Sequence, residues 1–221
     1  MGNLKDTMME AIANNGNGNY AYIDTLQEAK KVLVDEFGST LFTIAKDVKF
    51  QVEFNPETIS SYRLIGYDTR RLENEDFNDD TVDAGEIGSG HSVTVFYELI
   101  PAGMDLEEGL VDELKYSSTV STGSNEFLTV KIRYKAPDGN ESVLVEQAVE
   151  ASALKKRASD SFVFASAIAE FGLIVTDSDY RGSSSISNVL SRATYALGED
   201  AYGLRAEFIE LVQGYGQIVG Y

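Results

Sequence analysis

The sequence contains one segment that is dense in potential metal ligands, "ENEDFNDDTVDAGE" at residues 73–86. Carboxylate and amide oxygens are the hard ligands that Ca²⁺ prefers. We take Asp76, Asn78, Asp80 and Asp83 as the candidate ligands. The first three of them alternate along the chain, as the ligands do at positions 1, 3 and 5 of an EF-hand loop.

The match to an EF-hand loop is incomplete at two positions. Position 6, which needs glycine for the turn, is Thr81, and position 12, which needs a bidentate glutamate, is Ile87. Two interpretations therefore stay open. The segment is either a calcium loop of another kind that holds two strands together, or a solvated acidic loop between strands, and the sequence favours the solvated loop.

A second motif, "GNGNYAYID" at residues 16–24, fits the dinucleotide-binding pattern G-x-G-x-x-G/A. That pattern binds a pyrophosphate only where it follows a strand and opens a helix. Here the apolar spacing predicts a helix before the glycines and a short strand after them, which is the reverse order. We interpret Gly16 as a helix stop in the left-handed conformation, and we predict no nucleotide cofactor.

Nucleophilic catalysis is not indicated either. His91 is the single histidine, so a catalytic triad would need a serine and a carboxylate to converge on it. Residues 152–155 fit S-x-x-K, but neither S-D-N nor K-T-G follows. We therefore expect His91 to lie on a turn, and we predict that the protein is not an enzyme.

The first 38 residues read as helix, strand and helix. Met8 and Ile12 belong to one apolar helix face, and Tyr20–Ile23 is a short β-prone run. Thr25 and Glu28 form a capping box that starts a second helix, and Gly38 ends it. A lone four-residue strand needs neighbours to pair with. We therefore expect this piece to be mobile or to pair with a second copy of the chain, giving a homo-oligomer.

From residue 40 the hydrophobic period changes to two, with a single break at Lys46. Four further β-prone runs follow, and "APDGN" at residues 136–140 predicts a tight turn before the last of them. This pattern predicts an antiparallel β-sandwich. The runs are residues 40–54, 62–67, 92–100, 127–134 and 142–149.

After residue 151 the period returns to 3.6, which predicts a C-terminal layer of three helices packed on the sandwich. Their apolar stripes lie within residues 162–169, 186–197 and 204–212. The tail, residues 214–221, has no such stripe, and we predict that it is frayed. The predicted fold class is therefore α+β.

Composition excludes several functions. The net charge of −18 disfavours binding to nucleic acid or to an anionic membrane. The absence of cysteine removes disulfides and thiolate chemistry. No apolar run approaches the length needed to span a membrane, so we expect no membrane insertion, and the first residues lack the core of a signal peptide.

Long ordered stretches of the sequence resemble the C-terminal part of bacterial von Willebrand factor type A proteins of the YfbK-like kind. Residues 3–37, "NLKDTMMEAIANNGNGNYAYIDTLQEAKKVLVDEF", resemble the end of the A domain. The segments that resemble the following domain of unknown function are "LFTIAKDVKFQVEFNP", "YRLIGYDTRRLENEDFNDD", "DAGEIGSGHSVTVFYELIP", "FASAIAEFGLIVTDSDYRG" and "GLRAEFIELV".

The resemblance implies two parts, a remnant of a doubly wound A domain at residues 1–38 and the domain of unknown function at residues 39–221. The A domain's metal loop, D-x-S-x-S, does not occur in the sequence, so no metal ligand is carried over. The resemblance implies a non-catalytic protein-binding or structural module of the cell envelope or of a secreted protein, engaged in adhesion or assembly. A calcium-stabilised structural domain is the alternative.

Overall fold

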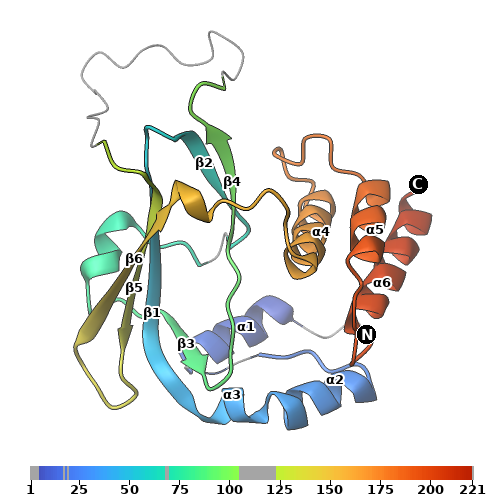
Figure 1. Cartoon of the computed structure of the whole chain (residues 1–221). Helices are drawn as coiled ribbons and strands as arrows, with labels where there is room; N and C mark the ends of the chain where they lie inside the picture. Colours follow the sequence, from blue (N-terminus) through green and yellow to red (C-terminus); the bar gives the residue numbers. More distant parts are fainter. Residues whose placement is uncertain (1–4, 17, 19, 68–69, 105–122, 221) are drawn as a thin grey trace. The chain divides into compact units, whose positions relative to one another are not determined.

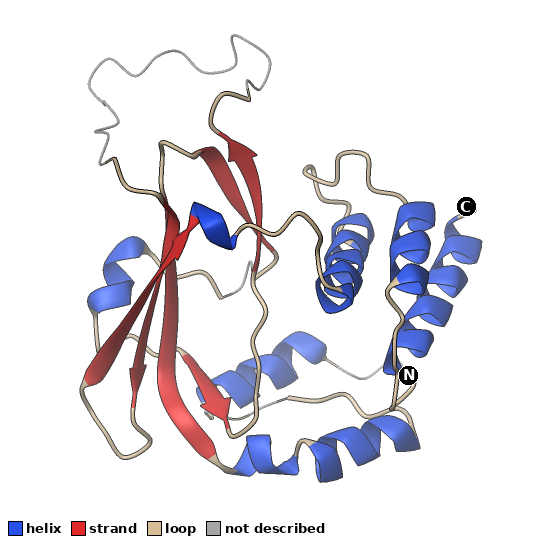
Figure 2. Ribbon diagram, in the orientation of Figure 1, coloured by secondary structure: helices blue, strands red, loops and turns tan. Residues whose placement is uncertain are grey.

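The computed structural model describes residues 5–16, 18, 20–67, 70–104 and 123–220 (Figures 1 and 2). It confirms the α+β class. The chain forms two compact units, which we describe separately. The first, the sheet unit, contains the N-terminal helices and a four-stranded sheet, and the second, the helical unit, contains the three C-terminal helices.

The four-stranded sheet has the order β3-β1-β5-β6, and every neighbouring pair is antiparallel. The hairpin between β5 and β6 closes at the predicted turn, where the Gly139 N–H donates to the Ala136 carbonyl at 2.9 Å. The strands are β1 (Thr43–Phe54), β3 (Gly85–Gly88), β5 (Glu126–Lys135) and β6 (Ser142–Glu150).

A two-stranded sheet joins β2 (Ile59–Ile65) to β4 (Phe96–Pro101). Residues 59–62 and 99–101 belong to the sheet unit, and residues 63–65 and 96–98 to the helical unit. Strand β4 begins at Phe96, so the strand predicted at residues 92–100 begins later than expected. The sandwich arrangement itself stays a prediction.

Strand β1 is interrupted where its alternation breaks. The register against β5 shifts between Lys46 and Lys49, and Asp47 has a φ of 51°, which few residues other than glycine adopt. Such a bulge re-aims the side chains beside it. The extra residue here is an aspartate, and its carboxylate becomes part of the candidate site described below.

The two faces of the four-stranded sheet differ in chemistry. The β5–β6 and β1–β5 registers place Val130 and Ile132 on one face with other apolar residues, and Lys131, Arg133 and Lys135 on the opposite face. A short 3₁₀ helix, η2 (Asn74–Asn78), lies against the basic face and buries Phe77, with the Arg133 guanidinium 5.6 Å from its ring. The acidic segment is therefore packed on basic residues.

Strand β3 was not predicted from the sequence, because two glycines and a glutamate in four residues carry little strand signal. Gly88 is buried at its end, and the Ser39 carbonyl lies where a Cβ on Gly88 would stand. The Ser89 N–H donates to the Phe42 carbonyl at 2.9 Å. These contacts hold α3 (Phe37–Leu41) against the sheet.

The N-terminal segment is helical but contains no strand among its described residues. Helix α1 spans Asp6–Asn15 and α2 spans Leu26–Lys30. The Thr25 hydroxyl accepts the Glu28 N–H at 3.1 Å, which is one half of the predicted capping box, whereas the Glu28 carboxylate pairs with Lys31 at 3.2 Å. A π turn, η1 (Lys31–Asp35), and α3 follow.

Three expectations for this segment are wrong. Residues 20–23 are not a strand, because within the described chain no neighbour pairs with them. Gly16 does not have a positive φ, since its N–H bonds back to the Ile12 and Ala13 carbonyls and extends the helical turn. Gly38 lies inside α3 rather than at a helix end.

The helical unit has its own core. Its helices are α4 (Asp160–Val175), α5 (Ile186–Tyr195) and α6 (Leu204–Val219). Val189 and Val212 are fully buried between them. The tail predicted to fray is helical up to Val219, because Gly216 is buried in the helix contact and Tyr215 packs edge-on against Phe171 at 5.4 Å. Gly220, with a φ of 80°, ends the helix, and residue 221 lies outside the described residues.

Candidate functional site

Two lysine side chains of the sheet hold the acidic segment in place. Lys49 and Lys135 are 4% and 9% exposed. The Lys49 ammonium donates to the Asp76 carbonyl at 3.0 Å and to the Asp79 carbonyl. The Lys135 ammonium donates to the Asp80 carbonyl at 2.7 Å. Both cations therefore occupy backbone oxygens of the kind that a calcium loop offers to its ion.

Three of the four predicted ligands have separate partners. The Asp76 carboxylate accepts the Glu73 N–H at 3.1 Å. The Asn78 side-chain oxygen accepts from the Arg133 guanidinium at 3.2 Å, and the Asp80 carboxylate accepts the Ser142 N–H at 3.2 Å. Their side chains thus fasten the segment to itself and to β5 and β6.

The fourth predicted ligand, Asp83, lies in an acidic cluster with Asp47 and Glu86. One carboxylate oxygen from each lies within 4.8 Å of the others. Among the described residues, this is the one group of three acidic side chains whose carboxylate oxygens lie close enough together to share an ion. One oxygen of Glu86, Oε1, is buried without a hydrogen-bond partner among those residues.

Asp47 and Glu86 were not among the predicted ligands. Glu86 belongs to the acidic segment but lies one residue before Ile87, which takes position 12 of the EF-hand alignment, and Asp47 comes from β1, 36 residues before Asp83. The signal that could have found Asp47 is the break in β1 at Lys46, because an aspartate follows it where a bulge re-aims side chains.

The cluster carries an uneven charge. Burial, followed by the charges of Asp83 and Asp47, raises the pKa of Glu86 above its usual value. Burial also acts to raise the pKa of Asp47, but the hydrogen bond and charge of Lys135, with the Ala84 N–H, outweigh it and hold that pKa below its usual value. Lys135 lies 2.7 Å from Asp47. This arrangement can hold either a cation or a proton.

His91 lies exposed on a turn, where its backbone N–H donates to the Gly88 carbonyl at 3.1 Å. The convergence with a serine and a carboxylate that a hydrolase needs is therefore not met among the described residues. In the S-x-x-K segment the Ser152 hydroxyl donates to the Glu150 carboxylate at 3.1 Å.

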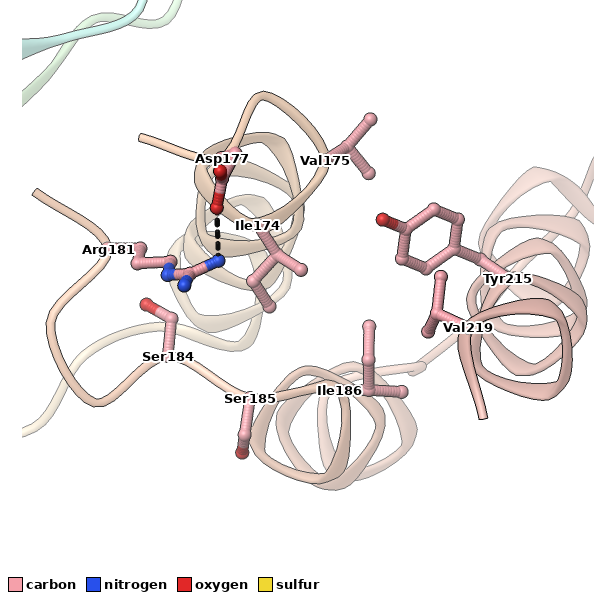
Figure 3. A pocket seen from close by; sticks show the side chains of 9 residues that line it. All are labelled: Ile174, Val175, Asp177, Arg181, Ser184, Ser185, Ile186, Tyr215 and Val219. Carbon is pink, nitrogen blue, oxygen red and sulfur yellow. Dashed lines mark hydrogen bonds and ion pairs between the residues drawn. The ribbon is translucent and has the colours of Figure 1, made fainter. Parts of the chain in front are cut away.

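The helical unit contains a cavity of about 390 Å³ between the ends of its helices (Figure 3). Ile174, Ile186 and Tyr215 form part of its apolar wall. At its polar end the Arg181 guanidinium is paired with the Asp177 carboxylate. The charges at that end therefore compensate each other, and the cavity offers an ion little attraction.

Helices long and apolar enough to cross a membrane do not occur among the described residues.

Comparison with known proteins gives one family. The family model described as the C-terminal part of the uncharacterized protein YfbK matches residues 39–218. The uncharacterized protein YfbK of Escherichia coli (strain K12) is 42% identical over 215 residues, covering 96% of this chain and 36% of that protein. The chain thus spans about a third of the relative's length. No solved structure matches the chain. This chain belongs to the family defined by the C-terminal part of YfbK.

Proposed function

We propose that the chain is a non-catalytic protein-binding or structural module that accompanies a von Willebrand A-like domain in a bacterial envelope or secreted protein. The observation that carries the proposal is the apolar surface of the N-terminal segment. Leu26 is 88% exposed, and Leu33, Val34 and Phe37 are each more than half exposed. Large apolar side chains that are exposed together along one short segment indicate an interface.

The comparisons support assigning this surface to a neighbouring domain. The family model starts at residue 39, after the exposed segment, whereas the YfbK relative matches 96% of the chain and is much longer. The segment thus lies outside the family's own domain but inside the similarity between the two proteins. An A-like domain has the apolar core that such helices need to cover.

Replacing Leu33 by serine tests this proposal. In the 221-residue chain the change should alter the free energy of unfolding by less than about 0.5 kcal/mol, because Leu33 is 61% exposed. In the full-length protein the same change should cost about 2–4 kcal/mol, because the side chain would be buried against the A-like domain. Thermal and denaturant unfolding of both proteins gives the comparison, and equal small effects in both would refute the proposal.

A calcium-stabilised structural domain is the second candidate, and the acidic cluster Asp47–Asp83–Glu86 favours it. Its carboxylate oxygens are close enough to share one ion, and the buried Oε1 of Glu86 lacks a partner among the described residues. Burial is the first cause that raises the pKa of Glu86 and the charges of Asp83 and Asp47 add to it; a bound Ca²⁺ would neutralise these charges.

Calcium should then raise the free energy of unfolding by RT ln(1 + [L]/Kd), or about 2.7 kcal/mol at a hundredfold excess over Kd, and the melting temperature should rise with it. Asp83→Asn should remove the shift, and Asp138→Asn, at an exposed turn position, should leave it intact. Calorimetric titration without heat, together with an unchanged melting temperature, would exclude calcium.

Without calcium the cluster should act through its proton. A raised folded-state pKa means that Glu86 contributes stability below its unfolded pKa and loses it as pH rises through the folded value. The contribution of Glu86 to stability in EDTA should therefore fall as the pH rises above about 4.5, and Glu86→Gln should abolish that part of the pH dependence. A pH profile unchanged by Glu86→Gln would contradict this account.

A further inference from the structure

Strand β6 forms one edge of the four-stranded sheet, and Glu146 is the one charged residue that protects its interior. The strand is nine residues long and contains no lysine or proline. Its one register irregularity against β5 lies at its end, between Glu126 and Leu128 of the partner strand. The opposite edge, β3, has four residues and two register shifts against β1. Natural edge strands are normally kept short, bulged, charged with lysine or interrupted by proline.

Two contacts show which backbone groups of β6 point away from β5. The Ser142 N–H donates to the Asp80 carboxylate at 3.2 Å, and the Ala148 carbonyl accepts from the Gln147 side chain at 2.7 Å. Alternate residues of an antiparallel strand direct their backbone groups to the same edge. Leu144 and Glu146, which lie between these two residues, therefore also point their N–H and C=O groups outward.

These two residues define the open edge of β6, residues 144–146. Within the described residues no strand pairs with it. Side chains reach past it on both sides of the sheet, with Val143, Leu144 and Val145 exposed by 51%, 43% and 46%. Side chains satisfy the outward Ser142 N–H and the outward Ala148 C=O near the ends of β6, so the centre is left for a partner.

The chemistry of the partner follows from the strand that already pairs with β6. On the inner edge, Lys131 of β5 lies opposite Glu146, and Ile132 lies opposite Val145. Side chains of β6 project above and below the sheet, so a strand added at the outer edge meets the same glutamate and the same valine. A partner with alternating basic and apolar residues complements both faces.

We propose that the open edge of β6 binds an extended segment of another protein in which apolar and basic residues alternate. The added strand gains main-chain hydrogen bonds from Leu144 and Glu146, and Glu141, Glu146 and Glu150 attract its basic side chains. A second copy of the chain is a poorer partner, because each copy carries a net charge of −18 and the two copies repel each other. The inference rests on the proposed protein-binding role and names the surface and partner chemistry for it.

A labelled peptide with the sequence of residues 128–135, LTVKIRYK, is a suitable probe for the full chain. We expect saturable binding by fluorescence anisotropy, weakened by salt, with new hydrogen-exchange protection at the amides of Leu144 and Glu146. The peptide LTVEIEYE, with its three basic residues replaced by glutamate, should bind at least about tenfold more weakly.

Three variants separate this proposal from others. Leu144→Pro removes an outward N–H, which an edge strand tolerates, and should weaken binding at least about tenfold, whereas Leu144→Val keeps the N–H and should bind within about twofold. Glu146→Lys should weaken binding of LTVKIRYK and strengthen binding of LTVEIEYE. Circular dichroism checks that each variant is folded.

Binding that is unchanged in both Leu144→Pro and Glu146→Lys, or protection away from β6, would overturn the proposal. So would self-association of the chain that protects these amides without peptide. Leu33→Ser should leave peptide binding unchanged, so a failure of the domain-contact proposal is distinguishable from a failure of this one.

Discussion

Replacing Gly88 by alanine is expected to lower the free energy of unfolding by at least about 3 kcal/mol. A Cβ at this position would stand 1.5 Å from the carbonyl oxygen and 2.4 Å from the carbonyl carbon of Ser39. These are backbone atoms, so the clash is not relieved by rotating a side chain. The chain would have to separate α3 from β3 and stretch the hydrogen bond from Ser89 to Phe42.

Gly85→Ala is the matched control, since Gly85 lies in the same strand and no heavy atom lies within 4 Å of the point where its Cβ would stand. It should change stability by less than about 1 kcal/mol. Neither glycine has a positive φ, so backbone strain does not separate the two variants. Urea unfolding of both measures the difference, and similar midpoints would show that Ser39 does not approach Gly88 as the structure places it.

The elements with strong local signals could be predicted from the sequence. The β5–β6 hairpin follows from two alternating runs around Pro137-Asp138-Gly139. Helices α4 and α5 begin where Ser159 and Ser185 cap them, each hydroxyl accepting a backbone N–H at 3.2 Å. In these segments the sequence within a few residues is enough to set the conformation.

The elements that depend on distant contacts could not be predicted. The last turns of α6 lack an apolar stripe, yet they are helical because Tyr215 and Gly216 pack within the helical unit. Conversely, Tyr20–Ile23 has β-prone residues but no partner strand among those described, so it forms no strand. Tertiary packing decides both cases against local preference.

The candidate site shows the same limit. The sequence identifies the acidic segment, but it cannot show that Lys49 and Lys135 bind its backbone carbonyls or that Asp47 lies beside Asp83. These contacts depend on the register of β1 against β5 and on the bulge at Asp47. A single break in the hydrophobic alternation was the visible sign of that bulge.

Replacing Lys135 by methionine is expected to lower the melting temperature by about 5–10 °C at pH 7. Methionine keeps much of the apolar stem and removes the charge. Asp47 would then lie beside Asp83 and Glu86 without its cation, and the Asp80 carbonyl would lose its donor. The hydrogen bond with Asp47 is also the main cause that raises the pKa of Lys135. Both groups of the wild-type ion pair therefore stay charged from the lowered pKa of Asp47 up to above pH 10.5.

The deficit should depend on pH in a defined direction. In the wild type the lowered pKa of Asp47 gives stability above its unfolded value that is lost as pH falls through the folded value, below 3.8. Without Lys135, burial remains the largest cause acting on Asp47, and burial raises the pKa of its carboxyl group. Protonation then relieves the unpaired charge, so the deficit of the variant should shrink as pH falls from 7 towards 5.

Lys131→Met is the matched control, because Lys131 lies on the same strand and pairs with Glu53, whose side chain is 69% exposed. Exposed pairs contribute little, so its melting temperature should fall by less than about 2 °C. Asp47→Asn tolerates the positive φ and, combined with Lys135→Met, should recover part of the loss by removing the unpaired charge. Differential scanning calorimetry from pH 5 to 7 measures all four proteins, and a deficit that is equal for both lysines or constant with pH would show that the charge balance around Asp47 does not stabilise the sheet unit.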